Sequence, residues 1–171
     1  MEWITRDIAI GDVDDARRFD ELCSAGIASI LSLNGWPNSA FNLHGLTWRC
    51  VELIDGHGND IRQLQQAVCY LHDLLTRGPV LVHCMQGVSR SPLVVASYLA
   101  DRTGRPFEEC LEEVSLVRKR TCLQPGLLEL RRAYETAIQP HERLTLSELS
   151  RPGEAGASEK LSSRTSLSGA D

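Results

Sequence analysis

Residues 80 to 92 read Val-Leu-Val-His-Cys-Met-Gln-Gly-Val-Ser-Arg-Ser-Pro and join a predicted strand to a predicted helix. The apolar run from Val80 to Val82 predicts a buried strand, which ends at His83 and Cys84. An apolar segment of helical length begins just after Arg90. The stretch therefore predicts a cysteine at the mouth of a strand and an arginine at the start of a helix.

The loop between these two residues suits a tetrahedral dianion. A loop between a strand and a helix N-terminus can point consecutive N–H groups inward, and the helix dipole adds roughly half a positive charge there. Gly87 permits a turn that a Cβ would hinder, and Pro92 fits the first turn of a helix. Arg90 offers a planar fork to two phosphate oxygens. We predict that phosphate is bound by Met85, Gln86, Gly87, Val88, Ser89 and Arg90.

The same electric field acts on Cys84. A free thiol has a pKa near ~8.5, which a helix N-terminus and nearby cations can lower to roughly 3.5–7.5. The thiolate is the nucleophilic form, so a loop that binds phosphate also activates the atom that attacks it.

The pattern His83-Cys84-x-x-Gly87-x-x-Arg90-Ser91 resembles the signature of the cysteine-dependent protein tyrosine phosphatases. The short chain is most similar to their dual-specificity branch, and the resemblance covers roughly residues 4 to 134. It implies an enzyme without metal or cofactor that hydrolyses phosphotyrosine and phosphoserine or phosphothreonine in phosphoprotein substrates through a phosphocysteine. The loop contains no lysine, unlike that of the lipid-directed relatives, which disfavours phosphoinositides.

A general acid must protonate the leaving oxygen and then serve as base for water. Asp55 follows a predicted strand and precedes a glycine-rich turn that gives it freedom to move. The resemblance places the family's acid on this connection, about five residues before a helix-capping residue, as Asp55 stands to Asp60. Asp60 is the alternative acid, although we expect it to cap the next helix.

Four further sites have two interpretations each. The Ser91 hydroxyl either helps the Cys84 sulfur to leave or caps the helix, and the two roles are compatible. His83 either orients the loop from behind or is a plain structural histidine. His57 contacts substrate or tunes Asp55, or is a solvated loop residue, which we favour. The sequence Arg118-Lys119-Arg120 is either a basic patch for phosphopeptides or a solvated helix end, and we favour the second.

Strands and helices alternate through the centre of the chain. This order predicts an α/β fold with a central, mostly parallel sheet flanked by helices, similar to that of the protein tyrosine phosphatases. Sites in such sheets lie at the carboxyl ends of the strands. The predicted elements are an opening hairpin that ends at Gly11, strands at Ile27–Leu33, Thr47–Leu53 and Val80–Val82, and helices from Asp12 or Asp14 to Ala25, from Asp60 to near Gly78, and over Leu93–Thr103, Phe107–Arg120 and Leu127–Ile138.

The chain has 171 residues, of which 42% are hydrophobic, enough for one domain with a sizeable core. We assign residues 1–140 to a catalytic domain and 141–171, rich in Ser, Gly, Glu and Arg, to a disordered tail. The net charge of −5 disfavours nucleic acid as a partner. No apolar run reaches membrane-spanning length, so we expect no membrane partner. We expect a monomer in the cytoplasm, with the nucleus as the alternative location.

The cysteines indicate a reducing compartment. There are six, without a C-x-x-C pair, zinc spacing or a secretory leader, so we expect unbridged thiols and no metal site. Cys23, Cys69 and Cys110 fall on apolar helical faces and are expected in the core. Other functions remain open: an inactive phosphate-binding relative, a phosphatase for non-protein esters, or a sulfurtransferase of rhodanese type. The last has no use for an acid such as Asp55 or for the Gly-x-x-Arg-Ser ending.

Overall fold

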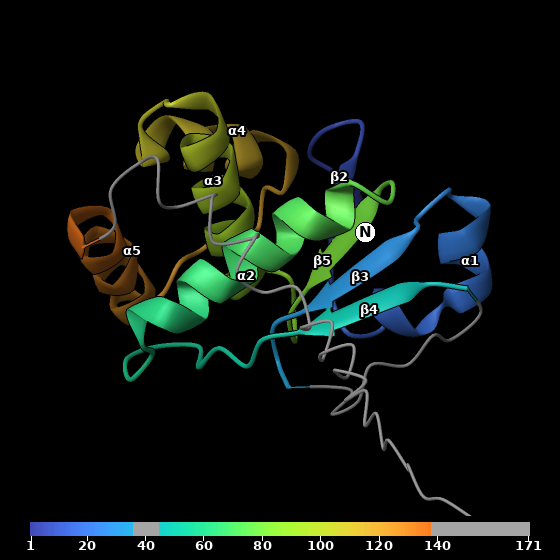
Figure 1. Cartoon of the computed structure of the whole chain (residues 1–171), viewed down its shortest axis with the longest axis horizontal. Helices are drawn as coiled ribbons and strands as arrows, with labels where there is room; N and C mark the ends of the chain where they lie inside the picture. Colours follow the sequence, from blue (N-terminus) through green and yellow to red (C-terminus); the bar gives the residue numbers. More distant parts are fainter. Residues whose placement is uncertain (36–44, 138–171) are drawn as a thin grey trace, which may run out of the picture.

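The computed structural model describes residues 1–35 and 45–137, which contain a single five-stranded sheet. Its strands follow the spatial order β1-β2-β5-β3-β4 (Figure 1). All neighbouring pairs are parallel except β1 with β2, which form the opening hairpin. The strands are β1 (Glu2–Trp3), β2 (Ile8–Gly11), β3 (Ser29–Ser32), β4 (Thr47–Cys50) and β5 (Val80–His83). The predicted α/β fold with a mostly parallel sheet is thereby confirmed.

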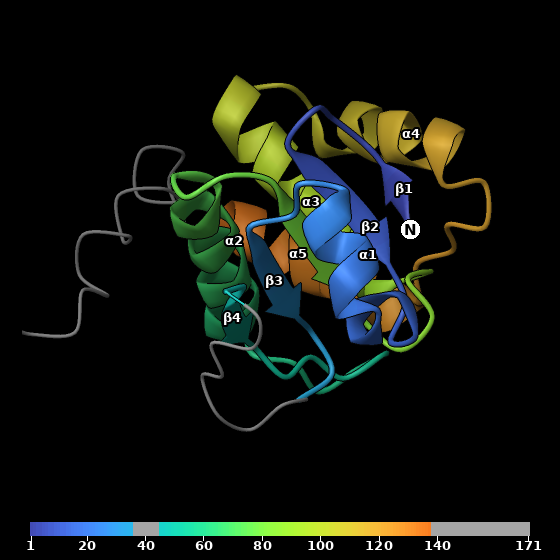
Figure 2. The same ribbon diagram turned by 90° about the vertical axis from the view of Figure 1, so that its right-hand side faces the viewer.

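Both faces of the sheet are covered, which explains the continuous apolar character of its central strands. Val80 and Val82 of β5 face one hydrophobic cluster, and Leu81 between them faces the other. The larger cluster receives α2 (Ile61–Leu75), α3 (Arg90–Thr103), α4 (Phe107–Val117) and α5 (Pro125–Ala137). The smaller one lies under the 3-10 helix η1 (Asp15–Arg17) and α1 (Phe19–Ser24), on the opposite side of the sheet (Figure 2).

The first helical segment differs from its prediction. Instead of one helix to Ala25, a 3-10 turn is followed by the six-residue α1, with a break at Arg18, where φ is −88° and ψ is 64°. The Asp12 side chain accepts hydrogen bonds from the N–H groups of Asp14 and Asp15 and so caps the 3-10 turn. Because α1 is so short, it buries only Leu22, and the prediction that Cys23 lies in the core is wrong.

The other helices follow their predicted apolar spacing but shift at their ends. Helix α3 begins at Arg90 rather than Leu93, since the Leu93 N–H already donates to the Ser89 carbonyl. Pro92 therefore lies in the first turn, where its missing N–H costs no hydrogen bond. Helix α4 ends at Val117, before the predicted Arg120. Cys69 and Cys110 are buried, as predicted, and no disulfide forms among the six cysteines, all of which lie in the described ranges.

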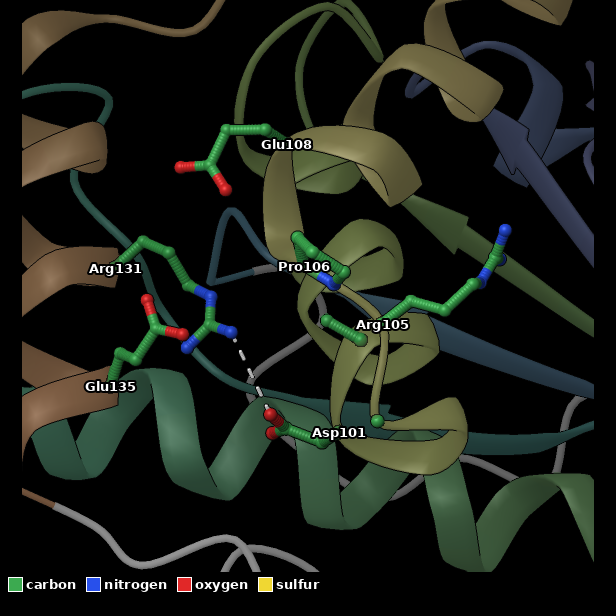
Figure 3. A pocket seen from close by; sticks show the side chains of 8 residues that line it. Asp101, Arg105, Pro106, Glu108, Arg131 and Glu135 are labelled. Atoms are coloured by element: carbon green, nitrogen blue, oxygen red, sulfur yellow. Dashed lines mark ion pairs between the residues drawn. The ribbon is translucent and has the colours of Figure 1, made fainter.

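A pocket opens at the C-terminal end of α3 (Figure 3). Arg131 of α5 extends toward Asp101 of α3, with 3.7 Å between the guanidinium and the carboxylate. The Tyr134 hydroxyl donates to the other oxygen of Asp101 at 2.6 Å. The Arg131 guanidinium also lies 5.0 Å from the ring centre of Phe107 and 5.2 Å from that of Tyr134. These contacts join α3, α4 and α5 on the face of the sheet that carries the larger hydrophobic cluster.

Some predictions fall outside the described ranges. The tail 141–171, the domain boundary at 140 and Ile138 all do, so the division into residues 1–140 and 141–171 stays a prediction. Within residues 1–35 and 45–137, no helix combines the length and the apolar character needed to cross a membrane.

Candidate active site

Cys84 follows β5 directly, at the carboxyl edge of the parallel strands where sites in such sheets lie. β5 lies between β2 and β3, so the cysteine emerges from the middle of the sheet, and it is only 2% exposed. The chain turns through Gly87, whose φ is +64°, and reaches α3 at Arg90. The structure thus places Cys84 and Arg90 at the two ends of one tight loop, as the sequence predicts.

The surroundings of Cys84 favour the thiolate. Burial raises the pKa of the thiol, but the hydroxyl and N–H of Ser91, the charge of Arg90 and the N–H of Gly87 outweigh it, so the pKa lies below its ordinary value. The Gly87 nitrogen is 3.2 Å from the Cys84 sulfur. The Ser91 Oγ is buried and has no hydrogen-bond partner of good geometry in the described part of the chain, so the thiolate is the acceptor that it can serve.

Arg90 connects the loop to the neighbouring strand end. Its side chain is 11% exposed, and its Nη1 donates to the Leu53 carbonyl at 3.1 Å. Its Nη2 lies 3.8 Å from Oδ2 of Asp55. The Nε is buried and has no hydrogen-bond partner among the described residues. Arg90, the predicted phosphate ligand, therefore lies beside Asp55, the predicted acid.

Asp55 stands on the connection between β4 and α2, with its side chain 44% exposed. The amide side chain of Asn59 closes this connection. Its Oδ1 accepts from the Ile54 N–H at 2.7 Å, and its Nδ2 donates to the carbonyls of Ile54 at 2.9 Å and Gly56 at 3.0 Å. Asn59 thus fixes the backbone on both sides of Asp55. Asn59 stands at the end of the glycine-rich turn after Asp55 and was not singled out from the sequence.

Asp60 is engaged at the start of α2. Its carboxylate accepts from the Arg62 N–H at 2.8 Å, and the Gln63 side chain accepts from the Asp60 N–H at 2.7 Å. This reciprocal arrangement is a capping box. The expected capping role of Asp60 is confirmed, and its carboxylate is committed to the helix.

The two histidines near the loop occupy different environments. His83 is fully buried, its Nδ1 lies 3.3 Å from the Cys84 carbonyl, and its ring stands edge-on to that of Trp48. Burial lowers its pKa to about 4, so the ring is neutral at pH 7. His57 is exposed and pairs with Glu129 of α5 at 3.2 Å. His57 is thus a solvated loop residue, as the favoured prediction held, with one contact to α5.

Arg118 departs from both interpretations of the Arg118-Lys119-Arg120 segment, whereas Lys119 and Arg120 are exposed, as the favoured interpretation expects. The Arg118 side chain is 1% exposed, and it donates to the carbonyls of Gly87 at 2.7 Å and Gln86 at 3.1 Å. It also forms an ion pair with Glu2 of β1. Arg120 pairs with Asp12 at 3.3 Å. Arg118 is thus neither a surface patch nor a solvated helix end but a support of the loop that sequence reasoning missed.

The residues described by the structure, 1–35 and 45–137, contain no group of three or more His, Cys, Asp or Glu side chains arranged to hold a metal ion. The side chains available to a substrate phosphate are the thiol of Cys84, the hydroxyl of Ser91, the guanidinium of Arg90 and the carboxylate of Asp55. Together they can supply a nucleophile, hydrogen-bond donors for an oxyanion and a proton.

Solved structures share this fold. The crystal structure of human DUSP28 aligns with a TM-score of 0.72 and 20% identity, covering 82% of this chain and 99% of that chain. The crystal structure of DUSP15 aligns with a TM-score of 0.65 and 24% identity, covering 81% and 96%. At these identities the likeness supports the fold alone, and it agrees with the predicted likeness to protein tyrosine phosphatases.

Sequence comparisons add the family. The chain is 32% identical over 120 residues to dual specificity protein phosphatase 22-A of Danio rerio, covering 69% of this chain and 57% of that protein. It is 28% identical over 145 residues to dual specificity protein phosphatase 22 of Homo sapiens, covering 84% and 74%. The alignments span about three fifths of the length of several such relatives. The family profile described as "Dual specificity phosphatase, catalytic domain" matches residues 30–136, more than half of the chain. This chain belongs to the dual specificity phosphatase family.

Proposed function

We propose that this chain is a protein phosphatase that hydrolyses phosphotyrosine and phosphoserine or phosphothreonine through a phosphocysteine on Cys84. The single observation that carries the proposal is the convergence on one loop of a buried thiol with a lowered pKa, the Arg90 guanidinium and the Asp55 carboxylate. Family membership supports the reaction class.

In the first step the Cys84 thiolate attacks phosphorus, and the bond between phosphorus and the ester oxygen breaks. Asp55, in its acid form, gives its proton to the departing oxygen. Arg90 and the loop N–H groups bind the three equatorial oxygens, over which the transition-state charge is spread. The products are the free alcohol or phenol and a phosphocysteine.

In the second step water attacks the phosphocysteine. Asp55, now a carboxylate, accepts a proton from that water as the bond between phosphorus and sulfur breaks. The sulfur leaves as a thiolate, which the Ser91 hydroxyl stabilises by donating a hydrogen bond. Inorganic phosphate departs, and the enzyme returns to its starting state.

The rim of the site favours a peptide over a polyanionic lipid head group. Ile54 beside the acid and Met85 in the loop are both 53% exposed, so apolar side chains flank the phosphate position. The carboxylate of Asp12 pairs with Arg120 and that of Glu129 with His57, and the phosphate loop contains no lysine. We propose that a phosphorylated side chain of a protein enters the loop while its flanking residues contact this rim. The monomeric state and the cytoplasmic location stay predictions.

The test measures hydrolysis of a phenyl phosphate, which has a poor leaving group, and of phosphotyrosine and phosphothreonine peptides at pH 5 to 8 without metal. Cys84→Ser should be inactive, since the nucleophile is lost. Asp55→Asn should lose on the order of 10²- to 10⁴-fold in kcat and the decline of rate at alkaline pH, because the amide has no proton to give.

An inert wild type that still binds orthovanadate would instead identify an inactive phosphate-binding relative. Turnover of small esters but of neither peptide would favour the alternative of a phosphatase for non-protein substrates. An Asp55→Asn variant as fast as wild type on the poor leaving group would exclude Asp55 as the acid.

A further inference from the structure

Arg118 is the residue whose structural position is least explained by the chemistry above. It lies just past the C-terminus of α4, and its guanidinium extends beneath the phosphate loop rather than into it. It touches no atom that reacts. A buried arginine needs compensation for its lost hydration, so its partners show what it does.

Those partners are main-chain oxygens of the loop. The Nε donates to the Gly87 carbonyl at 2.7 Å, and Nη2 donates to the Gln86 carbonyl at 3.1 Å. Nη1 pairs with Glu2, which fixes the far side of the guanidinium. The planar fork thus holds two consecutive carbonyls, an arrangement that a single ammonium group cannot reproduce.

The orientation of a carbonyl decides the orientation of the next N–H. In a trans peptide the C=O and the N–H of the same unit point in opposite directions. Holding the Gln86 carbonyl outward therefore turns the Gly87 N–H inward, and this N–H does lie 3.2 Å from the Cys84 sulfur. Holding the Gly87 carbonyl outward turns the Val88 N–H inward in the same way.

The remaining carbonyls of the loop are held by other segments. His83 Nδ1 lies 3.3 Å from the Cys84 carbonyl, and the Val13 N–H donates to the Met85 carbonyl at 3.2 Å. Arg118 donates to the Gln86 and Gly87 carbonyls. The Cys122 N–H donates to the Val88 carbonyl at 2.9 Å. Every carbonyl from residue 84 to 88 therefore has a partner on the outside of the loop. Arg118 is the partner of two of these carbonyls, those of Gln86 and Gly87.

We infer that Arg118 is a positioning residue for the reaction, whose guanidinium fork holds the Gln86 and Gly87 carbonyls outward so that the following N–H groups point at the thiolate and the phosphate. Arg118 remains charged at neutral pH, since burial and Arg120 lower its pKa only to about 10. The charged groups near the thiolate are Arg90 of α3, Asp55 of the β4–α2 connection and, behind the loop, Arg118 with Glu2, Asp12 with Arg120, and Asp15. The inference rests on the proposed function for its effect on turnover, but its effect on the loop is measurable without turnover.

The experiment compares Arg118→Met with Arg131→Met. Both remove one buried arginine, but Arg131 lies in the group at the other end of α3 and contacts no loop atom. The first readout is the pH dependence of Cys84 alkylation by iodoacetamide, followed on the Cys84 peptide by mass spectrometry. The second is the affinity for orthovanadate by calorimetry, and the third is kcat/KM for phenyl phosphate.

In Arg118→Met the alkylation midpoint should rise by about one pH unit, because an N–H donor to the thiolate is no longer held in place. The affinity for orthovanadate should fall about tenfold, and kcat/KM about 10²-fold, as when a donor is lost from an oxyanion site. Arg131→Met should lower the unfolding midpoint. It should leave the alkylation midpoint within about 0.3 pH unit of wild type, and the orthovanadate affinity and kcat/KM within about twofold.

Arg118→Lys keeps the positive charge but removes the guanidinium fork, so it separates the two contributions. It also tests the inference if Arg118→Met does not fold. One ammonium cannot hold both carbonyls, so orthovanadate should still bind at least about threefold more weakly than to wild type. The inference is overturned if Arg118→Lys equals wild type, or if Arg118→Met and Arg131→Met give the same alkylation midpoint and the same orthovanadate affinity. A wild type that is inert toward every ester would end the proposed function and leave the first two readouts to decide this inference.

Discussion

The two ends of α3 contain the same two unusual features, a buried arginine from a neighbouring segment and a glycine with positive φ. At the N-terminal end, Arg118 donates to backbone carbonyls, and Gly87 is enclosed by the Arg118 side chain and the Gly11 carbonyl. At the C-terminal end, Arg131 pairs with the Asp101 carboxylate, and a Cβ at Gly104 would meet no atom within 4 Å.

The difference lies in what each arginine holds. Arg131 binds side chains, so its loss changes packing between helices that lie behind the sheet. Arg118 binds the main chain of the loop whose N–H groups we propose to hold phosphate, so its loss is expected to change phosphate binding and turnover. A buried arginine is thus informative about a site when its partners are backbone atoms of that site.

The glycine pair gives the largest expected effect. Gly87→Ala places a Cβ against backbone and guanidinium at φ +64°, which should cost roughly 3 kcal/mol of unfolding free energy through strain and overpacking. The displaced loop should reduce kcat/KM about 10²-fold or more. Urea unfolding and phenyl phosphate kinetics measure the two effects.

Gly104→Ala is the matched control, because its φ of +71° imposes the same backbone strain in open space. It should cost about 1 kcal/mol and leave kcat/KM unchanged. Equal losses of activity in the two variants would show that the ends of α3 do not differ as described.

The second prediction concerns the pH dependence of stability. The pKa of His83 is about 4 in the folded chain and near 6.5 when it is exposed, with burial as the main cause. The unfolded state therefore binds the proton more strongly, and the unfolding free energy should fall by about 3 kcal/mol from this group as the pH drops from 6.5 to 4. Above pH 6.5 His83 is neutral in both the folded and the unfolded chain, so it does not lower the unfolding free energy there. In His83→Gln, urea unfolding should show a correspondingly smaller loss over that range.

Val114→Ala on α4 serves as the control, since it removes buried apolar volume without a titrating group. Its loss of stability should be the same at every pH. If His83→Gln does not fold, the ring of the wild type can be followed by NMR, and protonation above about pH 5.5 would contradict the prediction.

Most of the fold and the residues that we propose to react were accessible to sequence reasoning because their signals are local. The apolar run before Cys84, the glycine at 87 and the arginine at 90 lie within one short stretch, and the structure places them as expected. The capping role of Asp60 is equally local. The break at Arg18 and the exposure of Cys23 were missed, since six residues of helix are too few to show a period.

Arg118 was missed for a different reason. Its contact with the loop joins residues 31 positions apart, and no local pattern encodes such a pairing. One signal was nonetheless present, because Arg118 continues the buried stripe formed by Phe107, Cys110 and Val114 at helical spacing. A charged residue that continues an apolar stripe predicts a buried charge, which needs a hydrogen-bonding or oppositely charged partner elsewhere in the fold. Its partner is the loop.

The smallest predicted effect concerns Asn59. Its substitution tests whether the contacts that position the acid Asp55 are separate from those that position the phosphate loop. Asn59→Asp keeps the acceptor for the Ile54 N–H and loses the two donors to the Ile54 and Gly56 carbonyls. Because the Asp55 connection is then less ordered, kcat/KM for phenyl phosphate should fall about tenfold, which corresponds to about 1.4 kcal/mol.

The leaving group separates the two roles. An activated ester such as p-nitrophenyl phosphate departs with little need for a proton, so the Asn59→Asp variant should lose less than about threefold on it. Arg118→Met should slow both esters alike, because both need the loop N–H groups. Gln66→Ala on the exposed face of α2 controls for a lost amide elsewhere and should change neither rate. If Asn59→Asp slowed both esters equally, Asn59 would belong with Arg118 as a support of the phosphate site, and the acid would be held by other contacts.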